Sequence, residues 1–193
     1  MTLIKAIDPQ KAEGKTGEIF KSVEQRLGRV PNMLKLLGHS PSGLAGYLAY
    51  TEAFESGPMP SRLRGLLTAA IAELSGSDYV LSLAYVLGQR QGVSVDEVTA
   101  ARRLESDDPK AAAALRFAAK VIEGRGHGSE PELKKLQAAG YTDAEIVEIV
   151  GFIGLSLVRN YFNIVLGTAP DVPLPKEVGH AAGRLGAQPR VSG

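Results

Sequence analysis

The stretch PSRLRGLLTAAIAELSGSDYVLSLAYVLGQRQ, residues 60–91, decides the fold. Its first half places apolar residues at helical spacing, and Ser75-Gly76-Ser77 interrupts that pattern. In its second half, Ser82 is the only clearly polar residue between Tyr79 and Leu87. A helix without a polar face has to be surrounded by other elements or by another subunit. The stretch therefore predicts a central antiparallel helical hairpin.

The rest of the chain repeats helical spacing and shows no alternating strand pattern, so we predict an all-α fold. Capping boxes at 94–97, 129–132 and 142–145 mark helix starts. The last helix should run from Asp143 to about Leu166. We expect one helical domain over residues 1–169 and a Pro/Gly-rich tail over 170–193, disordered alone or laid on a neighbour. The residues expected in the core of the last helix are Ile146, Ile149, Val150, Ile153 and Leu157, with Gly151 and Gly154 allowing a close neighbour.

Composition excludes several classes of function. The net charge of +1 argues against nucleic-acid binding, which needs a dense positive face. The absence of cysteine excludes disulfides, thiolate catalysis and thiol metal ligands. The three histidines are far apart in sequence, so no metal and no cofactor is expected. Residues 1–10 contain no apolar signal segment and the run 149–158 is too short to span a bilayer, so we expect a cytoplasmic protein without a membrane partner.

Three segments together resemble one known family. Residues 28–33 (GRVPNM) with Ser40-Pro41, the hairpin 62–84 and the end segment 159–167 follow each other in the order seen in carboxymuconolactone decarboxylase-like and alkyl hydroperoxidase D-like proteins. The resemblance covers roughly residues 27–167. It implies an all-α fold, an orthogonal multi-helix bundle of the alkyl hydroperoxidase D-like type, and a homo-oligomer, a trimer or a hexamer. The redox members of this family are thiol peroxidases.

The family's functional positions are all replaced in this chain. The resemblance places Ser77 at the first cysteine of the Cys-x-x-Cys pair and Val80 at the second, Ala84 at the histidine and Gly65 at the glutamate. Serine and valine cannot perform thiol–disulfide chemistry, and glycine and alanine remove the proton relay. We therefore predict that thiol peroxidase activity is absent. The vestigial site either keeps a cavity for a small ligand or is filled by its neighbours, and close packing favours filling.

Other polar residues near the hairpin have two interpretations each. Asp78 and Tyr79 either begin a capped helix or act as base and acid of a lyase. Glu73 is a further catalytic candidate, but a salt bridge with Arg62 or Arg159 is favoured.

Two further groups are weaker candidates for a ligand role. His127 lies in a glycine-rich loop that lacks the ending of a phosphate-binding loop. On the last helix, a polar cluster either satisfies buried groups and a subunit contact or binds a ligand: Arg159, Asn160, Tyr161 and Asn163.

These observations predict a homo-oligomeric protein that binds a small molecule or a protein partner without thiol peroxidase chemistry. The ligand would be a small apolar molecule or a carboxylate. The alternative is a cofactor-free lyase or decarboxylase acting on a small carboxylate or lactone, which is the chemistry of the family's founding branch. A purely structural role, carried by the apolar hairpin and the tail, remains a third possibility. The apolar second helix of the hairpin predicts that the protein is not a monomer.

Overall fold

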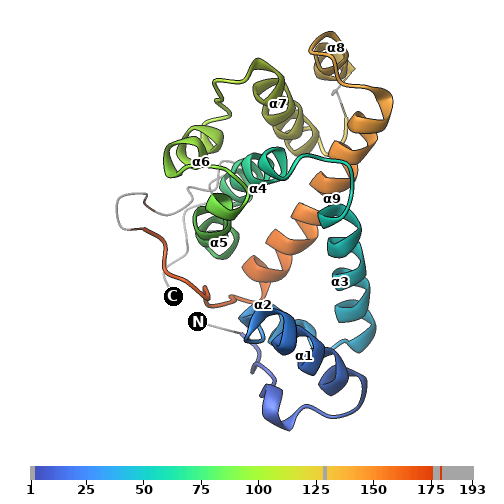
Figure 1. Ribbon diagram of the computed structural model, residues 1–193, viewed down its shortest axis with the longest axis vertical. Helices are drawn as coiled ribbons and strands as arrows, with labels where there is room; N and C mark the ends of the chain where they lie inside the picture. The colour runs from blue at the N-terminus through green and yellow to red at the C-terminus, as the bar shows by residue number, and fades with distance from the viewer. Residues whose placement is uncertain (1–2, 128–129, 176–178, 180–193) are drawn as a thin grey trace.

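The computed structural model describes residues 3–127, 130–175 and 179, and these contain nine α-helices and no strand (Figure 1). The predicted all-α class is therefore confirmed. The elements are a short 3-10 helix η1 (Pro9–Lys11), α1 (Gly14–Leu27), α2 (Asn32–Leu37), α3 (Pro41–Glu55), α4 (Ser61–Ser75), α5 (Asp78–Arg90), α6 (Val95–Arg102), α7 (Pro109–Glu123), α8 (Glu130–Ala138) and α9 (Asp143–Val165).

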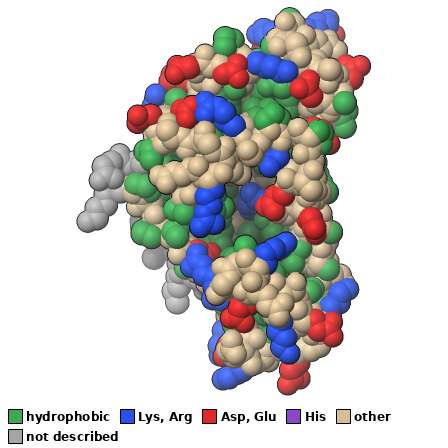
Figure 2. Space-filling view, in the orientation of Figure 1, with side chains coloured by type: hydrophobic (Ala, Val, Ile, Leu, Met, Phe, Trp, Pro, Cys, Tyr) green, Lys and Arg blue, Asp and Glu red, His purple; other side chains and the backbone are tan. Residues whose placement is uncertain are grey.

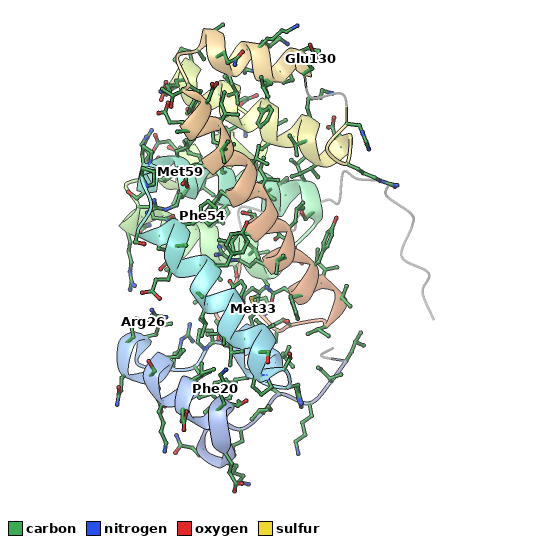
Figure 3. All side chains as sticks on the ribbon, turned by 90° about the vertical axis from the view of Figure 1, so that its right-hand side faces the viewer. Phe20, Arg26, Met33, Phe54, Met59 and Glu130 are labelled. Carbon is green, nitrogen blue, oxygen red and sulfur yellow. The ribbon has the colours of Figure 1, made fainter. Side chains whose placement is uncertain are left out.

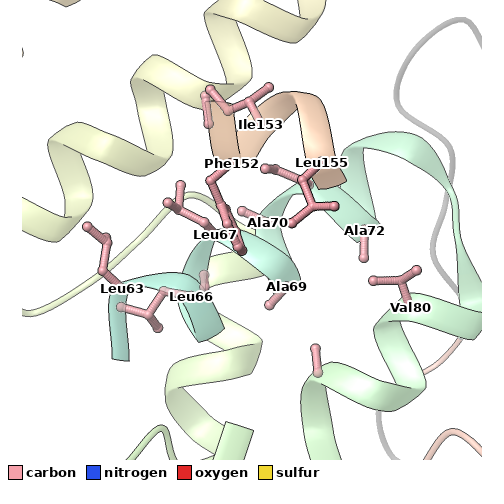
Figure 4. Packing of buried hydrophobic residues seen from close by; sticks show 14 of the residues in the cluster. Leu63, Leu66, Leu67, Ala69, Ala70, Ala72, Val80, Phe152, Ile153 and Leu155 are labelled. Atoms are coloured by element: carbon pink, nitrogen blue, oxygen red, sulfur yellow. The ribbon is translucent and has the colours of Figure 1, made fainter. Parts of the chain in front are cut away.

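The predicted central hairpin is formed by α4 and α5. Gly76 takes a left-handed conformation, with φ of 73°, that ends α4 at no steric cost. The Ser77 side chain then accepts from the backbone N–H of Val80 and begins α5. Ten of the fifteen residues of α4 are buried, because α5, α6, α7 and α9 all pack against it. Figure 4 shows leucines and alanines of α4 between α5 and α9.

Helix α9 is the long element that connects the two ends of the molecule (Figure 1). Ile146, Ile149 and Ile153 are buried as predicted, and Leu157 is partly buried. Val150 was expected in the core, but 46% of its surface is exposed. It follows Ile149 directly and so lies about 100° further around the helix. Among the described residues, no helix, α9 included, has the length and apolarity needed to cross a bilayer.

Helices α3 and α9 approach each other closely at glycine, as the sequence predicts. The Phe54 ring lies over Gly151, where an added β-carbon would be 2.6 Å from its Cζ. Tyr50 donates from its hydroxyl to the Gly151 carbonyl oxygen at 2.9 Å. Phe54 also makes edge-to-face contacts with Tyr50 and Phe152. Figure 3 shows this aromatic group between the two helices.

Helices α1 and α2 form the end of the molecule opposite α8 (Figure 1). Phe20 of α1 is buried, and the Thr16 hydroxyl donates to the carbonyl oxygen of Gly38 at 3.0 Å. The chain after α9 returns to this end. The carboxylate of Asp171 accepts from the backbone N–H of Asn32 at 3.2 Å, so it caps α2 from a distant part of the chain. Residues 176–178 and 180–193 of the predicted tail lie outside the described residues.

Two of the three predicted capping boxes are confirmed. Ser94 with Glu97 begins α6, and Thr142 with Glu145 begins α9. The third contains Ser129, which lies outside the described residues. These caps fix where the helices that flank α4 begin.

The α3–α9 contact can be tested by adding a single methyl group. We expect Gly151→Ala to lower the free energy of unfolding by about 1–3 kcal/mol, because its β-carbon would displace the packed Phe54 ring. The control is Gly46→Ala in α3, where an added β-carbon has no neighbour within 4 Å. There the better helix propensity of alanine should stabilise the protein by up to about 1 kcal/mol. Urea unfolding measures both, and equal effects would contradict the packing.

Candidate functional site

The family positions at the start of α5 face the packed core. Ser77 is 1% exposed, Val80 1% and Ala84 3%. The Ser77 Oγ accepts from the Val80 N–H at 3.4 Å, which is the role of a helix cap. None of the three lines either of the two cavities described below. Their surroundings agree with a site filled by neighbours, and a ligand at these positions stays a prediction.

Gly65 lies at the other end of the hairpin from Ser77. Twelve residues separate the two in sequence, and a helix rises about 1.5 Å per residue. A β-carbon on Gly65 would be 2.9 Å from both the Gln91 Oε1 and the Val93 Cγ2, so this position has no free space. The structure therefore does not bring Gly65 together with Ser77.

Glu73 forms a buried ion pair, but its partner is not the one predicted. The sequence favoured a salt bridge with an arginine such as Arg62 or Arg159, and a salt bridge does form, but with Arg102. The Arg102 Nε donates to the Glu73 Oε2 at 2.9 Å, and the Arg102 Nη1 donates to the Tyr85 hydroxyl at 3.2 Å. The reason is that α6 folds back over α4 and brings Arg102 to it. Glu73 is committed to a structural contact and is a poor catalytic candidate.

The hydroxyl of Tyr79 is also engaged in hydrogen bonds. Its hydroxyl donates to the Asp171 Oδ2 at 2.5 Å and accepts from the backbone N–H of Met33 at 3.4 Å. Burial, and then the hydrogen bond to Asp171 and the negative charge of that carboxylate, raise the pKa of Tyr79. A phenol with a raised pKa is a weak proton donor, which argues against Tyr79 as a general acid. Asp78 is the first residue of α5, where a carboxylate complements the helix dipole.

The side chains of the predicted polar cluster on α9 lie on different faces of the helix, because consecutive residues lie about 100° apart. Asn160 and Asn163 are buried, whereas 56% of Tyr161 is exposed. Asn163 donates from its Nδ2 to the carbonyl oxygen of Arg159 at 2.8 Å. Only Arg159 of the four lines a cavity described below. His127 is exposed, and no group of side chains able to hold a metal is found in the part of the chain that the structure describes.

A cavity of about 270 Å³ lies between α5 on one side and α3 on the other, with α9 between them. We call it the Arg159 cavity. Met33, Leu34 and Tyr79 are buried in its wall, and Leu48 and Leu83 are partly buried. Its exposed margin carries charge, because the side chains there include Arg26, Glu52 and Glu55. Figure 2 shows a hollow between these elements, with hydrophobic side chains in its depth and charged ones around it.

Arg159 supplies the positive charge inside this cavity. Its Nε donates to the Tyr47 hydroxyl at 2.9 Å. Within residues 3–127, 130–175 and 179, no carboxylate lies within 4.0 Å of the guanidinium, and neither Nη donates a hydrogen bond. Burial lowers the pKa of Arg159, but Tyr47 and Glu55 more than offset this and raise it above its ordinary value. The group is therefore a permanent, partly buried cation with free donors.

A cation of this kind suits a carboxylate. The two Nη groups of a guanidinium match the two oxygens of a carboxylate, which gives a charge-assisted, bidentate contact. The apolar wall beside it fits the usual composition of small-molecule sites, in which few polar groups orient the ligand. Sequence reasoning singled out Arg159 but not the cavity, since Tyr47, Leu83 and Met33 carry no signal that they meet around it.

Comparison with solved structures identifies the fold. No family model and no curated protein matches the sequence. Among solved structures, an uncharacterized peroxidase-related protein with the alkylhydroperoxidase AhpD core, from Ralstonia eutropha JMP134, superposes with a TM-score of 0.76 at 20% identity, over 88% of this chain and 92% of that chain. A peroxidase-related protein from Silicibacter sp. TM1040 has a TM-score of 0.74 at 20% identity, over 92% and 97% of the two chains.

A third structure of the same fold is an enzyme with a bound small molecule. It is a variant of the debrominase Bmp8 in complex with 2,3,4-tribromopyrrole, with a TM-score of 0.73 at 21% identity, over 89% of this chain and 92% of that one. This chain therefore has the AhpD-like fold, as the sequence resemblance implied, and it has it without a single cysteine. Likeness at this level of identity establishes the fold alone.

The Glu73–Arg102 pair gives a stability prediction. We expect Glu73→Gln to lower the free energy of unfolding by about 3 kcal/mol, because it leaves the mostly buried Arg102 charge without its counter-ion. The matched control is Glu105→Gln, which breaks the exposed Arg103–Glu105 pair and should cost less than about 1 kcal/mol. Urea unfolding at neutral pH measures both variants. A cost for Glu73→Gln no greater than that of the control would contradict the buried pair.

Proposed function

We propose that this protein binds a small molecule without thiol peroxidase chemistry, and that the ligand is a carboxylate with an apolar body held in the Arg159 cavity. The observation that carries the proposal is the partly buried Arg159 guanidinium, which lines an apolar cavity with its two Nη donors free among the described residues. The carboxylate would pair with these donors, and the apolar body would lie against Met33, Leu34 and Leu83. The tribromopyrrole complex supports this, because it shows that the fold can accommodate a small ring compound.

Ligand binding can be measured by calorimetry with 3-phenylpropanoate, using the neutral 3-phenylpropanol as the isosteric comparison. We expect the carboxylate to bind and the alcohol to bind at least about tenfold more weakly, because a charge-assisted hydrogen bond contributes about 1.5–3 kcal/mol. Arg159→Gln should remove this preference for the carboxylate. The control Arg116→Gln changes an exposed arginine on α7 and should leave both affinities unchanged. Equal affinities for acid and alcohol in the unmodified protein would overturn the proposal.

Peroxide reduction provides a separate test of the missing sulfur chemistry. With tert-butyl hydroperoxide as substrate and dithiothreitol as reductant, we expect consumption no faster than in a protein-free reaction. The chain contains no cysteine to serve as nucleophile or resolving thiol. Turnover that rises with the concentration of pure protein would contradict this expectation.

A cofactor-free lyase or decarboxylase is the second candidate, and it would use the same cavity. Glu52 and Glu55 line the cavity together with Arg159, so a carboxylate base and a cation face one space. The catalytic candidates Glu73 and Tyr79 do not support a lyase, since Glu73 is paired with Arg102 and the Tyr79 hydroxyl is hydrogen-bonded to Asp171. Carbon dioxide release from a bound carboxylate that stops in Glu55→Gln, with binding retained, would distinguish an enzyme from a binding protein.

We also propose that the protein works as a homo-oligomer, a trimer or a hexamer, as the family resemblance implies. What supports this is an exposed apolar stripe on α9. Five residues at helical spacing are between 40% and 70% exposed: Val147, Val150, Val158, Tyr161 and Val165. A helix that is apolar on a second face beside its core face requires a partner surface.

Light scattering tests the assembly directly. The unmodified protein should have a mass that is a multiple of 20.4 kDa, and Val158→Glu should reduce it, because a carboxylate would be desolvated in the contact. The control Val95→Glu alters an equally exposed valine at the first position of α6 and should leave the mass unchanged. A single 20.4 kDa species for the unmodified protein would contradict the proposal.

A further inference from the structure

A second cavity of about 270 Å³ lies at the other end of α9 from Arg159. It opens between the α3–α4 connection and the first turns of α4, α7 and α9. Its interior is apolar, since Met59, Leu63, Leu66 and Ile149 in its wall are all buried. We call it the Glu148 cavity. An enclosed apolar volume with charged groups at its opening is the usual form of a small-molecule site.

The two basic side chains at this cavity are already engaged. Arg62 pairs with Glu97 and donates to the carbonyl oxygen of Gly92 at 2.8 Å. Lys110 pairs with Glu145 at 3.3 Å and lies 4.3 Å from the centre of the Tyr141 ring. Neither cation is therefore free to receive an anionic ligand.

Three acidic residues line the same cavity, and two of them, Asp108 and Glu148, form no ion pair within 4.0 Å in the described part of the chain. Asp108 caps α7 by accepting from the backbone N–H of Lys110 at 2.9 Å, and Glu145 pairs with Lys110. For Glu148, no basic group lies within 4.0 Å anywhere in the described part of the chain. Its Oε2 lies 3.6 Å from the point that a β-carbon on Gly57 would occupy, which places the carboxylate beside the α3–α4 connection.

The charged side chains that line the cavity sum to one negative charge, since two of them are basic and three are acidic. Burial, and then the charges of Asp108 and Glu145, raise the pKa of Tyr141 to about 12. The excess charge and the free carboxylate both favour a cationic ligand.

We infer that the Glu148 cavity binds a small amine. The ammonium group would pair with the Glu148 carboxylate at the opening, and an apolar body would enter between Met59, Leu63 and Leu66. This site is separate from the Arg159 cavity, because eleven residues of α9, about 16 Å at 1.5 Å per residue, lie between Glu148 and Arg159. The two cavities therefore select ligands of opposite charge.

The test uses 2-phenylethylamine as the probe, with the neutral 2-phenylethanol as its comparison, in calorimetry on the full chain. We expect saturable binding of the amine, about tenfold or more tighter than that of the alcohol, from one charge-assisted contact. Glu148→Gln should remove this difference. Ala144→Phe, at an exposed position on the wall of the cavity, keeps the charge of Glu148 but fills the space and should weaken both probes.

The matched control is Glu18→Gln, which removes an exposed carboxylate from α1 and should leave both affinities unchanged. Arg159→Gln should also leave amine binding unchanged, so failure of one site does not decide the other. Equal affinity for amine and alcohol, full amine binding in Glu148→Gln, or no saturable binding of the amine would each overturn the inference.

Discussion

Helix α4 is largely buried by its neighbours, and this packing determines how the other elements are arranged. Its small and branched side chains allow four other helices to pack against it, so ten of its fifteen residues are buried, Arg64, Thr68 and Ser75 are half-buried, and Ser61 and Arg62 in its first turn are exposed. An element in that position cannot present a side chain to a ligand except at its ends. The hairpin turn is closed by a left-handed glycine and a serine cap, and α5 turns its Ser77 face toward the core. The Arg159 cavity and the Glu148 cavity both lie where the outer helices diverge.

Much of the fold followed from the sequence, because the signals that determine it are local. The apolar run 60–91, the proline and glycine breaks and the two described capping boxes give helix type and limits to within a few residues. Val150 shows where this reasoning fails. An apolar residue beside a core stripe belongs either to the core or to a second apolar face, and periodicity alone does not distinguish them. The exposed stripe of α9 became visible only when its neighbours were in place.

The site was less predictable, since its contacts join residues distant in sequence. Glu73 meets Arg102 only because α6 folds back over α4, and Asp171 meets Tyr79 only because the chain returns after α9. No sequence pattern encodes either contact. Arg159 was part of the predicted polar cluster, but its importance lies in the absence of a carboxylate within 4.0 Å of its guanidinium among the described residues, although Glu55 lines the same cavity. Such an absence can be seen only when the surrounding helices are known.

The two proposed sites would let an AhpD-like fold recognise small molecules with charge in place of sulfur. Each combines an apolar wall with one ionised group that forms no ion pair within 4.0 Å in the described chain, a cation in one cavity and an anion in the other. Keeping such a charge partly buried and unpaired costs free energy of desolvation. A ligand of opposite charge offsets part of this cost, so each site should prefer a ligand of opposite charge. Neither arrangement uses the positions where the family's thiols would lie.

A crystal structure with bound 3-(4-bromophenyl)propanoate is the most direct test of carboxylate binding at Arg159, because the anomalous signal of bromine locates the ligand without prior assumptions. We expect a bromine peak in the Arg159 cavity and carboxylate oxygens within hydrogen-bonding distance of the guanidinium. A ligand bound instead beside Ser77 and Val80, with Arg159 left unpaired, would contradict this expectation.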